Sequence, residues 1–408
     1  MSGQLRDRIN VSLQAVAQVL VVCGLGVYLA RKHGLDRSAI AAVSNVNWHV
    51  LIPALMFSSI VGAVTPANLA LLWPMLLASL LHILLGVVPA LLLGWAAKLP
   101  RDMCFFAVMA SSLPNCGNLP WLFMPSIIKY YAPPGEAAAQ SQYMVGLVSV
   151  YTIITILVTL TVPFIFKRAP DTLLLPRRRQ QGEAAGPQLP QLQDTSSVQL
   201  QVVETEIAAV AAATAGKQVQ VRQLHHLAAD GTGAAAAVNV PLGATVLGIC
   251  CAAVGPVRGL LVDDQAPLHW LWLSLSWVGA AAAPLATMQI GAELMQAAPV
   301  ELGMRVSRWA QWLATAIAIL VKLLLVPLMN VAIIRTAGMH TLVPPEDKVY
   351  QLLLLVEAAV PAAVTLLVVC GRVYPDIRPL SQMLFWQYVA SLVTLPAFLV
   401  WFMYMLEL

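Results

Sequence analysis

Apolar stretches of about 20 residues, separated by short polar connections, recur along almost the whole chain. A helix of that length crosses the hydrocarbon core of a bilayer, so each stretch predicts one membrane-spanning helix. The predicted spans cover residues 9–30, 43–63, 69–97, 104–128, 142–166, 240–262, 269–296, 309–336, 349–371 and 381–406. The pattern therefore predicts an all-α polytopic membrane protein with ten transmembrane helices, five in each half.

A hydrophilic insert, residues 167–239, separates the two sets of spans. It contains an arginine triplet, Arg177–Arg179, and a stretch rich in proline and glutamine, 187–193. Such a composition cannot bury a hydrophobic core, which predicts a mostly disordered loop. The expected organisation is an N-terminal five-helix repeat (1–166), this loop (167–239) and a C-terminal five-helix repeat (240–408).

The two halves share short features at similar offsets. The matching pairs are Gln142–Val148 with Gln387–Val393, Pro53 with Pro284, and Pro120 with Pro361. Because five is an odd number, a second copy of a five-span unit enters the membrane from the opposite side. The sequence therefore predicts two inverted repeats, an arrangement typical of secondary transporters.

The fourth span contains an unusual polar stretch, Ser111–Pro120, with two asparagines and a glycine between prolines. Proline removes a backbone donor and clashes with the preceding turn, so Pro114 and Pro120 around Gly117 predict a broken helix. The simpler alternative is a proline kink whose asparagines only satisfy the backbone. Broken backbone at membrane depth is tolerated where it is buried in protein or lines a cavity, and Pro361 in the ninth span supplies a second break. Together the two breaks favour a binding site.

Composition excludes several classes of protein. Of the 408 residues, 59% are hydrophobic and 10% are charged, and the mean hydropathy is +0.78. Soluble domains carry about 25% charged residues, so a soluble enzyme is excluded. The sequence contains no nucleotide-binding loop, no HExxH helix and no CxxC pair, so we expect no ATP-driven pump, no enzyme, no metal site and no cofactor.

The charge distribution predicts the topology. The net charge of +4 is small and the basic residues lie mostly in connections, which argues against a nucleic-acid surface. If the N-terminus is lumenal or extracellular, cytosolic connections hold 16 lysines and arginines against 6 on the other side. The positive-inside rule then makes the central loop cytosolic.

The stretch Asn115–Pro120 resembles the crossover motif of the PIN-LIKES auxin carriers, within the wider auxin efflux carrier superfamily. Further similarity lies in Pro53–Ser59, in Lys322 with Pro327, and in Phe385–Ser391. The resemblance implies ten helices with the fourth and ninth crossing as discontinuous helices, transport of auxins such as indole-3-acetic acid by alternating access, an endoplasmic reticulum membrane location and a homodimer.

One departure from the family pattern lies in the ninth span. Where the family tends to have a proline pair followed by an asparagine, this chain has Pro361–Thr365, with a hydroxyl in place of the amide. An auxin is a flat indole with a carboxylate, and half-helix N-termini with Asn115 and Asn118 can donate hydrogen bonds to such an anion. The alternative role of both asparagines is to cap the broken ends. The candidate substrate-binding residues are Asn115, Gly117, Asn118, Pro120, Pro361, Thr365, Lys322, Glu357 and Phe57.

Lys322 and Glu357 are ionisable residues inside predicted spans, where such groups are costly and commonly functional. They can pair with each other, or Lys322 can face an anionic substrate while Glu357 binds a proton. His82, in the third span, is expected to be a hydrogen-bonded core residue. Phe57 is a candidate aromatic wall because it lies close to Pro53.

The expected activity is facilitated, potential-driven transport of an organic anion, because the region of the ninth and tenth spans has no paired-aspartate arrangement that would indicate obligate proton exchange. Two alternatives stay open. One is a sodium- or proton-coupled carrier of another organic anion, which a sodium requirement would favour. The other is a ligand-sensing membrane receptor without net flux, which binding without counterflow would favour.

Overall fold

The computed structural model describes residues 2–32, 37–66, 69, 72–168, 240–297, 308–336, 346–371, 373–374 and 376–408. Nearly all of the predicted central loop lies outside these residues. The described chain is helical and contains no β-strand. In chain order the elements are α1 (Ser2–Lys32), α2 (Arg37–Val46), the π-helix η1 (Asn47–Leu51), α3 (Ile52–Ala63), α4 (Leu72–Ala96), α5 (Arg101–Ser112), α6 (Asn118–Tyr131), α7 (Ala137–Arg168), α10 (Val240–Ala253), α11 (Gly255–Val262), α12 (His269–Ala280), α13 (Ala282–Ala297), α14 (Arg308–Leu320), the π-helix η3 (Val321–Leu325), α15 (Val326–Thr336), α16 (Lys348–Ala359), α17 (Thr365–Gly371) and α18 (Arg378–Met405).

Seven helices of the described chain are long and apolar enough to cross a membrane. They cover Gly3–Lys32, Ala39–Ala63, Leu72–Ala96, Ala137–Pro163, His269–Leu294, Arg308–Arg335 and Arg378–Met405. Each coincides with a span predicted from the sequence. The molecule is therefore an integral membrane protein, and the remaining predicted spans differ from continuous helices.

The predicted sixth span, 240–262, is not one straight helix. α10 ends at Ala253, and α11 turns away from it by 106°. Val254 between them has extended backbone, and Pro256 follows in the first turn of α11. A proline there cannot continue the preceding helix, because its ring clashes with the turn before it. The predicted sixth span therefore contains a sharp bend.

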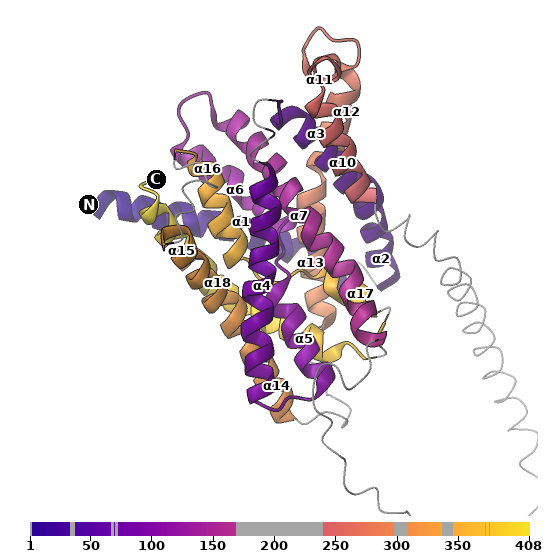
Figure 1. The fold of residues 1–408 in the computed structure, drawn as a ribbon, viewed down its shortest axis with the longest axis vertical. Coiled ribbons are helices and arrows are strands. Elements are labelled where there is room, and N and C mark those ends of the chain that lie inside the picture. The colour runs from indigo at the N-terminus through magenta and orange to yellow at the C-terminus, as the bar shows by residue number, and fades with distance from the viewer. Residues whose placement is uncertain are drawn as a thin grey trace, which may run out of the picture. The chain divides into compact units, whose positions relative to one another are not determined.

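The middle of the helical assembly is built around α16, which is buried along most of its length. Helices α6, α7, α15 and α18 pack against it. Figure 1 shows α16 beside α6, α15 and α18. α16 belongs to the predicted ninth span, so that span lies in the protein interior and not at the lipid surface.

Two glycines allow helices to approach closely near the core. A Cβ at Gly291 of α13 would overlap the carbonyl oxygen of Cys23 in α1, and a Cβ at Gly86 of α4 would overlap the carbonyl oxygen of Ser111 in α5. Helices that associate within a bilayer commonly use small residues to bring backbones together. Gly86 thereby fixes the position of the end of α5, where the fourth predicted span is interrupted.

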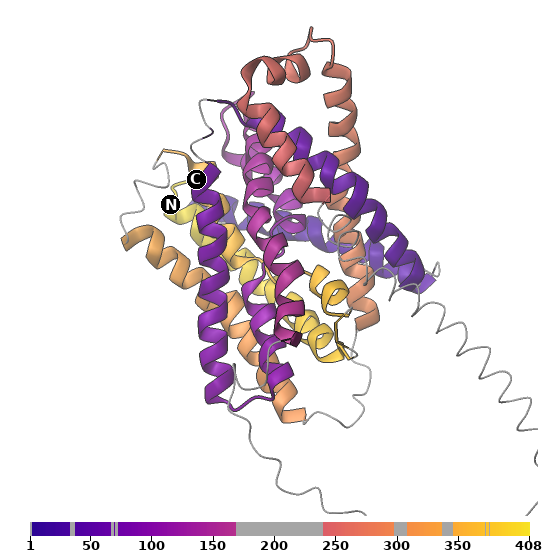
Figure 2. The same cartoon turned by 45° about the vertical axis from the view of Figure 1, so that its right-hand side comes forward.

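The connections gather at two opposite ends of the helices. At one end, Arg8 of α1 donates a hydrogen bond from Nε to the carbonyl oxygen of Leu408 at 2.7 Å, and Figures 1 and 2 show both chain ends there. At the other end, Arg101 donates to the carbonyl oxygen of Phe166 at 3.0 Å. The ring of Phe105 stacks on that of Tyr374 there, with 5.3 Å between the centroids. The start of α5 and the connection after α17 are therefore neighbours.

Candidate functional site

Both spans that were predicted to be discontinuous are interrupted in the structure. α5 ends at Ser112 and α6 begins at Asn118, while α16 ends at Ala359 and α17 begins at Thr365. The residue after α5, Leu113, is extended (φ −104°, ψ 99°), as is the residue after α16, Val360 (φ −68°, ψ 147°). Each extended residue precedes a proline, which disfavours helical backbone in the residue before it.

The two extended segments pair with each other. The amide N–H of Asn115 donates to the carbonyl oxygen of Pro361 at 2.8 Å, and that of Ala363 donates to the carbonyl oxygen of Leu113 at 3.0 Å. Together they form an antiparallel bridge that places Pro114 opposite Ala362. We call these two segments, 113–117 and 360–364, the crossing. The crossing satisfies backbone groups that neither helix can satisfy alone.

Gln387 of α18 completes the hydrogen bonding of the crossing. Its Nε2 donates to the carbonyl oxygen of Ala110 at 3.0 Å, the group whose helical partner would have been the N–H that Pro114 lacks. The same Nε2 lies 3.2 Å from the carbonyl oxygen of Ala318. Its Oε1 accepts from the amide N–H of Ala362 at 2.9 Å. One fully buried glutamine therefore joins both broken helices.

The next residue, Tyr388, binds the side chain of Asn115. Asn115 Nδ2 donates to the Tyr388 hydroxyl at 2.7 Å, and this hydroxyl donates to the carbonyl oxygen of Ala362 at 3.1 Å. Asn115 is only 3% exposed. In this conformation the Asn115 amide is thus part of the crossing itself.

Lys322 lies in the π-helix η3 and is 1% exposed. Its Nζ donates to the carbonyl oxygen of Ala358, in the last turn of α16, at 3.2 Å. A cation at a helix C-terminus compensates free carbonyl groups and the negative end of the helix dipole. Glu357 precedes Ala358 and is fully buried, yet neither of its carboxyl oxygens has a hydrogen-bond partner among the described residues. Neither Lys322 nor Glu357 forms an ion pair with a described residue. The first alternative, in which the two residues pair with each other, is therefore not realised as a direct contact.

The structure places the remaining candidates of the fourth and ninth spans around the crossing. Asn118 and Thr365 occupy equivalent positions, each the first residue of the second half-helix, and both are half-buried. A Cβ at Gly117 would lie 3.1 Å from the ring of Trp121, so this glycine lets the indole lie against the connection. Pro361 lies in the connection itself.

Pro120 has a different role from the predicted one. It was expected to break the helix together with Pro114, but it is the third residue of α6. The backbone N–H groups in the first turn of a helix have no acceptor within the helix, so a proline there is compatible with the start of the helix and does not interrupt it. The break is produced by Pro114 and lies wholly before Asn118.

Two other residues named from the sequence lie elsewhere. Phe57 is half-buried on α3, which packs against α7 and α12. His82 is a hydrogen-bonded core residue, as expected: its Nδ1 lies 2.7 Å from the hydroxyl of Tyr151, and its Nε2 lies 2.9 Å from Oδ1 of Asn330. Asn330 in turn donates from Nδ2 to the carbonyl oxygen of Leu354 in α16 at 3.1 Å. This network ties α4, α7 and α15 to α16.

Two residues that hold the crossing together, Gln387 and Tyr388, were missed by the sequence reasoning. Gln387 and Tyr388 had been used only as markers of the repeat and of the family resemblance. The signal that could have found them is an amide and a phenol side by side in an apolar span, which is costly without a partner. Trp121 lies beside Gly117 and is 7% exposed, and its indole N–H has no hydrogen-bond partner in the described chain.

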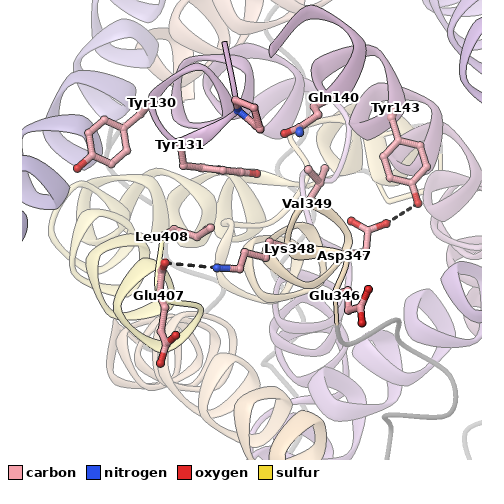
Figure 3. Close-up of a pocket in the computed structure, with 11 residues that line it drawn as sticks. Tyr130, Tyr131, Gln140, Tyr143, Glu346, Asp347, Lys348, Val349, Glu407 and Leu408 are labelled. Carbon is pink, nitrogen blue, oxygen red and sulfur yellow. Dashed lines mark hydrogen bonds between the residues drawn. The ribbon is translucent and has the colours of Figure 1, made fainter. Parts of the chain in front are cut away.

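A separate pocket of about 690 Å³ opens at the end where α6 finishes and α16 starts. It is lined by Tyr130, Tyr131, Pro133, Gln140, Tyr143, Glu346, Asp347, Lys348, Val349, Glu407 and Leu408. Figure 3 shows its two hydrogen bonds, from the Tyr143 hydroxyl to Asp347 Oδ2 at 2.8 Å and from Lys348 Nζ to the Glu407 carbonyl at 3.4 Å.

Hydrophobic helices long enough to span a bilayer, together with two interrupted helices that meet inside the protein, define a polytopic membrane protein of the transporter type. The chain belongs to the family described as membrane transport protein, whose model matches residues 11–399. This membership agrees with the prediction of a transporter and not an enzyme.

Several PIN-LIKES proteins of Arabidopsis thaliana are similar to the chain over most of its length. PIN-LIKES 1 is 26% identical, with 98% of this chain and 81% of the relative covered. PIN-LIKES 3 is 25% identical, with 96% and 97% covered, and PIN-LIKES 6 is 22% identical, with 98% and 94% covered. The predicted resemblance to the PIN-LIKES proteins is confirmed.

Proposed function

We propose that this protein transports an auxin-like organic anion, such as indole-3-acetate, across a membrane by alternating access, with the substrate bound at the crossing. The observation that carries the proposal is the pairing of two interrupted helices at buried prolines. Transporters place substrate sites where discontinuous helices meet, because free backbone groups there can bind ligands.

The crossing offers groups that suit an aromatic carboxylate. α6 begins there with Asn118, so its first backbone N–H groups and its positive dipole end face the connection. The indole N–H of Trp121 is a buried donor without a partner in the described chain. The amide of Asn115 becomes available if its bond to Tyr388 opens. Choice of auxin as the substrate class rests on the resemblance of Asn115–Pro120 to the crossover motif of the PIN-LIKES auxin carriers.

We interpret the described helices as ten spans in two inverted five-helix repeats. Seven helices span by themselves, the bent pair α10–α11 is the sixth span, and the interrupted pairs α5–α6 and α16–α17 are the fourth and ninth. α5–α6 leads from the end holding Arg101 to the end holding Tyr131, and α16–α17 leads in the opposite direction. Opposite directions are what an inverted second half requires.

The cellular setting follows from the charge distribution and the family resemblance. The end that holds the pocket of Figure 3 is then lumenal, together with the N-terminus, and residues 167–239 are cytosolic. The membrane is that of the endoplasmic reticulum, where the protein contributes to auxin homeostasis, and the assembled form is a homodimer, as in the family.

The test is counterflow in proteoliposomes loaded with unlabelled indole-3-acetate, because exchange needs no external driving force. Labelled indole-3-acetate should enter vesicles that contain the wild-type protein. An Asn115→Ala variant should lose at least about nine-tenths of this uptake, since one lost hydrogen bond to a charged ligand is worth about 1.5–3 kcal/mol. Asn45→Ala, which removes an exposed asparagine of α2, is the matched control. Equal counterflow in both variants would reject the crossing as the site, and binding of indole-3-acetate without counterflow would favour a receptor.

A further inference from the structure

Glu357 is the one carboxyl-bearing residue of the described chain that is fully buried, at 0% exposed. It lies three residues before Val360, where α16 gives way to the crossing. Neither carboxyl oxygen is hydrogen-bonded within the described residues. An ionised carboxylate in such a place loses its hydration and receives no hydrogen bond in exchange, which is strongly unfavourable. The group must therefore hold a proton or attract a cation in this conformation.

The ionisable groups around Glu357 come from several elements. Lys322 from η3, Cys116 from the crossing and Tyr151 from α7 are close enough for their charges to interact with that of Glu357. Lys322 already donates to Ala358. The Tyr151 hydroxyl is engaged with His82 of α4, at 2.7 Å.

Among the described residues, the other packed elements contribute polar groups near this point that are already hydrogen-bonded. α15 contributes Asn330, whose amide bridges His82 and α16, and α18 contributes Tyr388, whose hydroxyl is held by Asn115 and by the crossing. A metal cation at Glu357 would face the positive charge of Lys322 and would find few oxygen ligands. No cluster of acidic, histidine or cysteine side chains able to hold a metal occurs among the described residues. A proton is the cation that fits.

We propose that Glu357 binds an exchangeable proton that is carried across the membrane together with the organic anion. The proposal rests on the function proposed above. With Glu357 protonated, the positive charge of Lys322 beside the crossing is uncompensated and attracts an anion. With Glu357 ionised, the two charges cancel and the attraction is lost.

The proton and the anion therefore favour each other's binding by the same factor. One proton is taken from the solution on one side, bound as the carboxylic acid of Glu357, and released to the solution on the other side. Transport of one monovalent anion with one proton moves no net charge. Glu357 lies one turn before the break, so any rearrangement of the crossing moves the end of α16 and with it Glu357. Such a movement would let the carboxyl group exchange its proton with the solution on either side of the membrane.

The experiment compares driving forces in proteoliposomes with labelled indole-3-acetate, after subtracting uptake by protein-free vesicles, since the protonated acid crosses lipid unaided. In the wild-type protein, an acidic outside solution should drive accumulation at zero membrane potential, and an imposed potential alone should not. Above the pH at which Glu357 releases its proton, the apparent affinity should fall about tenfold per pH unit, the slope for one linked proton.

Glu357→Gln keeps the shape and stays neutral, so it mimics the protonated state. The affinity of this variant for indole-3-acetate should not depend on pH, and its uptake should respond to membrane potential because it carries the anion alone. Glu136→Gln, at an exposed carboxyl group between α6 and α7, should behave as the wild type.

Two results would overturn the proposal while leaving the proposed function intact. One is wild-type uptake that follows the potential and ignores the proton gradient, which the sequence alone had led us to expect. The other is a Glu357→Gln variant whose pH dependence equals that of the wild type. If the variant does not fold, the wild-type comparison of the two gradients decides. Absence of wild-type counterflow would instead reject the proposed function, and the proton-linked mechanism with it.

Discussion

The prolines of the two interrupted helices leave particular backbone groups without helical partners, and polar side chains of neighbouring helices replace those partners. Pro114 cannot donate to the carbonyl oxygen of Ala110, and Gln387 does so in its place. The carbonyl oxygen of Ala358 receives Lys322 in place of a helical N–H, because the N–H of Ala362 donates to Gln387. The polar residues at the crossing thus have a structural role in this conformation.

Replacing Gln387 by methionine should destabilise the protein markedly. The change leaves buried groups of both broken helices unpaired, and each such group costs about 1–3 kcal/mol. Thermal unfolding in detergent measures the effect. Gln382→Met on the same helix is the matched control, since the Gln382 amide oxygen is buried without a partner in the described chain, and it should be neutral or slightly stabilising. Equal loss of stability in both variants would show that the Gln387 bonds contribute little.

Tyr388→Phe removes only the hydroxyl that connects Asn115 to the crossing. We expect a loss of about 1–3 kcal/mol of stability, because the Asn115 amide and the Ala362 carbonyl oxygen are left buried and unpaired. Tyr404→Phe, at an exposed position of α18, should change the unfolding temperature little. Unfolding temperatures of the two variants that coincide would contradict the assigned role of Tyr388.

At the residue scale, the sequence predicted positions better than roles. Asn115, Pro361 and Lys322 lie at or beside the crossing. They could be selected from the sequence because prolines and polar or charged residues stand out in an apolar span. The partners of these groups could not be predicted, since hydrogen bonds such as that from Asn115 to Tyr388 join residues far apart in the chain. Pro120 was predicted to help break the helix. Its actual place in the first turn of α6 depends on where α5 ends before Pro114, which the sequence does not show.

At the scale of elements, irregular helical turns accompany the prolines. The π-helices η1 and η3 directly precede the helices that begin near Pro53 and Pro327. Each proline removes one backbone donor, and a wider turn is one way in which the helix accommodates that loss. Lys322 lies in one of these turns. Periodicity in the sequence predicts that a helix exists but not such local changes of turn, which is also why the bend at Val254 was not foreseen.

The close packing of α1 on α13 gives a prediction at this scale. Gly291→Ala would place a Cβ against the backbone of Cys23, so the helices must separate at a cost of about 1–3 kcal/mol. Gly243→Ala in α10 is the matched control, because no atom lies within 4 Å of the added Cβ. That control should be slightly stabilising, since alanine favours helix over glycine. Unfolding temperatures in detergent distinguish the two, and a stable Gly291→Ala variant would contradict the close approach.

At the scale of the whole molecule, the interrupted pairs α5–α6 and α16–α17 both run between the same two sides of the protein. Residues around Tyr131 and Lys348 line one pocket, and Arg101 lies with Phe166 at the opposite end, close to Tyr374. The alternation of predicted spans places the connections on these same two sides. Hydropathy could predict these two sides because each span reverses the direction of the chain. The meeting of 113–117 with 360–364 could be expected only from the repeat of the prolines in the two halves and from the family resemblance.

Cysteine labelling tests the proposed topology. Glu136→Cys and Lys348→Cys should react with a membrane-impermeant maleimide from the lumenal side only, and Lys98→Cys and Asp376→Cys from the cytosolic side only. All four positions are exposed, so lack of reaction cannot be attributed to burial. The protein without these changes provides the background from its own cysteines. Labelling of both pairs from the same side would contradict the arrangement.

Photolabelling tests most directly whether the substrate binds at the crossing. A photoreactive azido derivative of indole-3-acetate, irradiated with the protein and analysed by mass spectrometry of the peptides, should attach within residues 113–121 or 360–366. Excess indole-3-acetate should abolish that label. Competable label confined to the pocket around Tyr130 and Tyr131, with none at the crossing, would contradict the account.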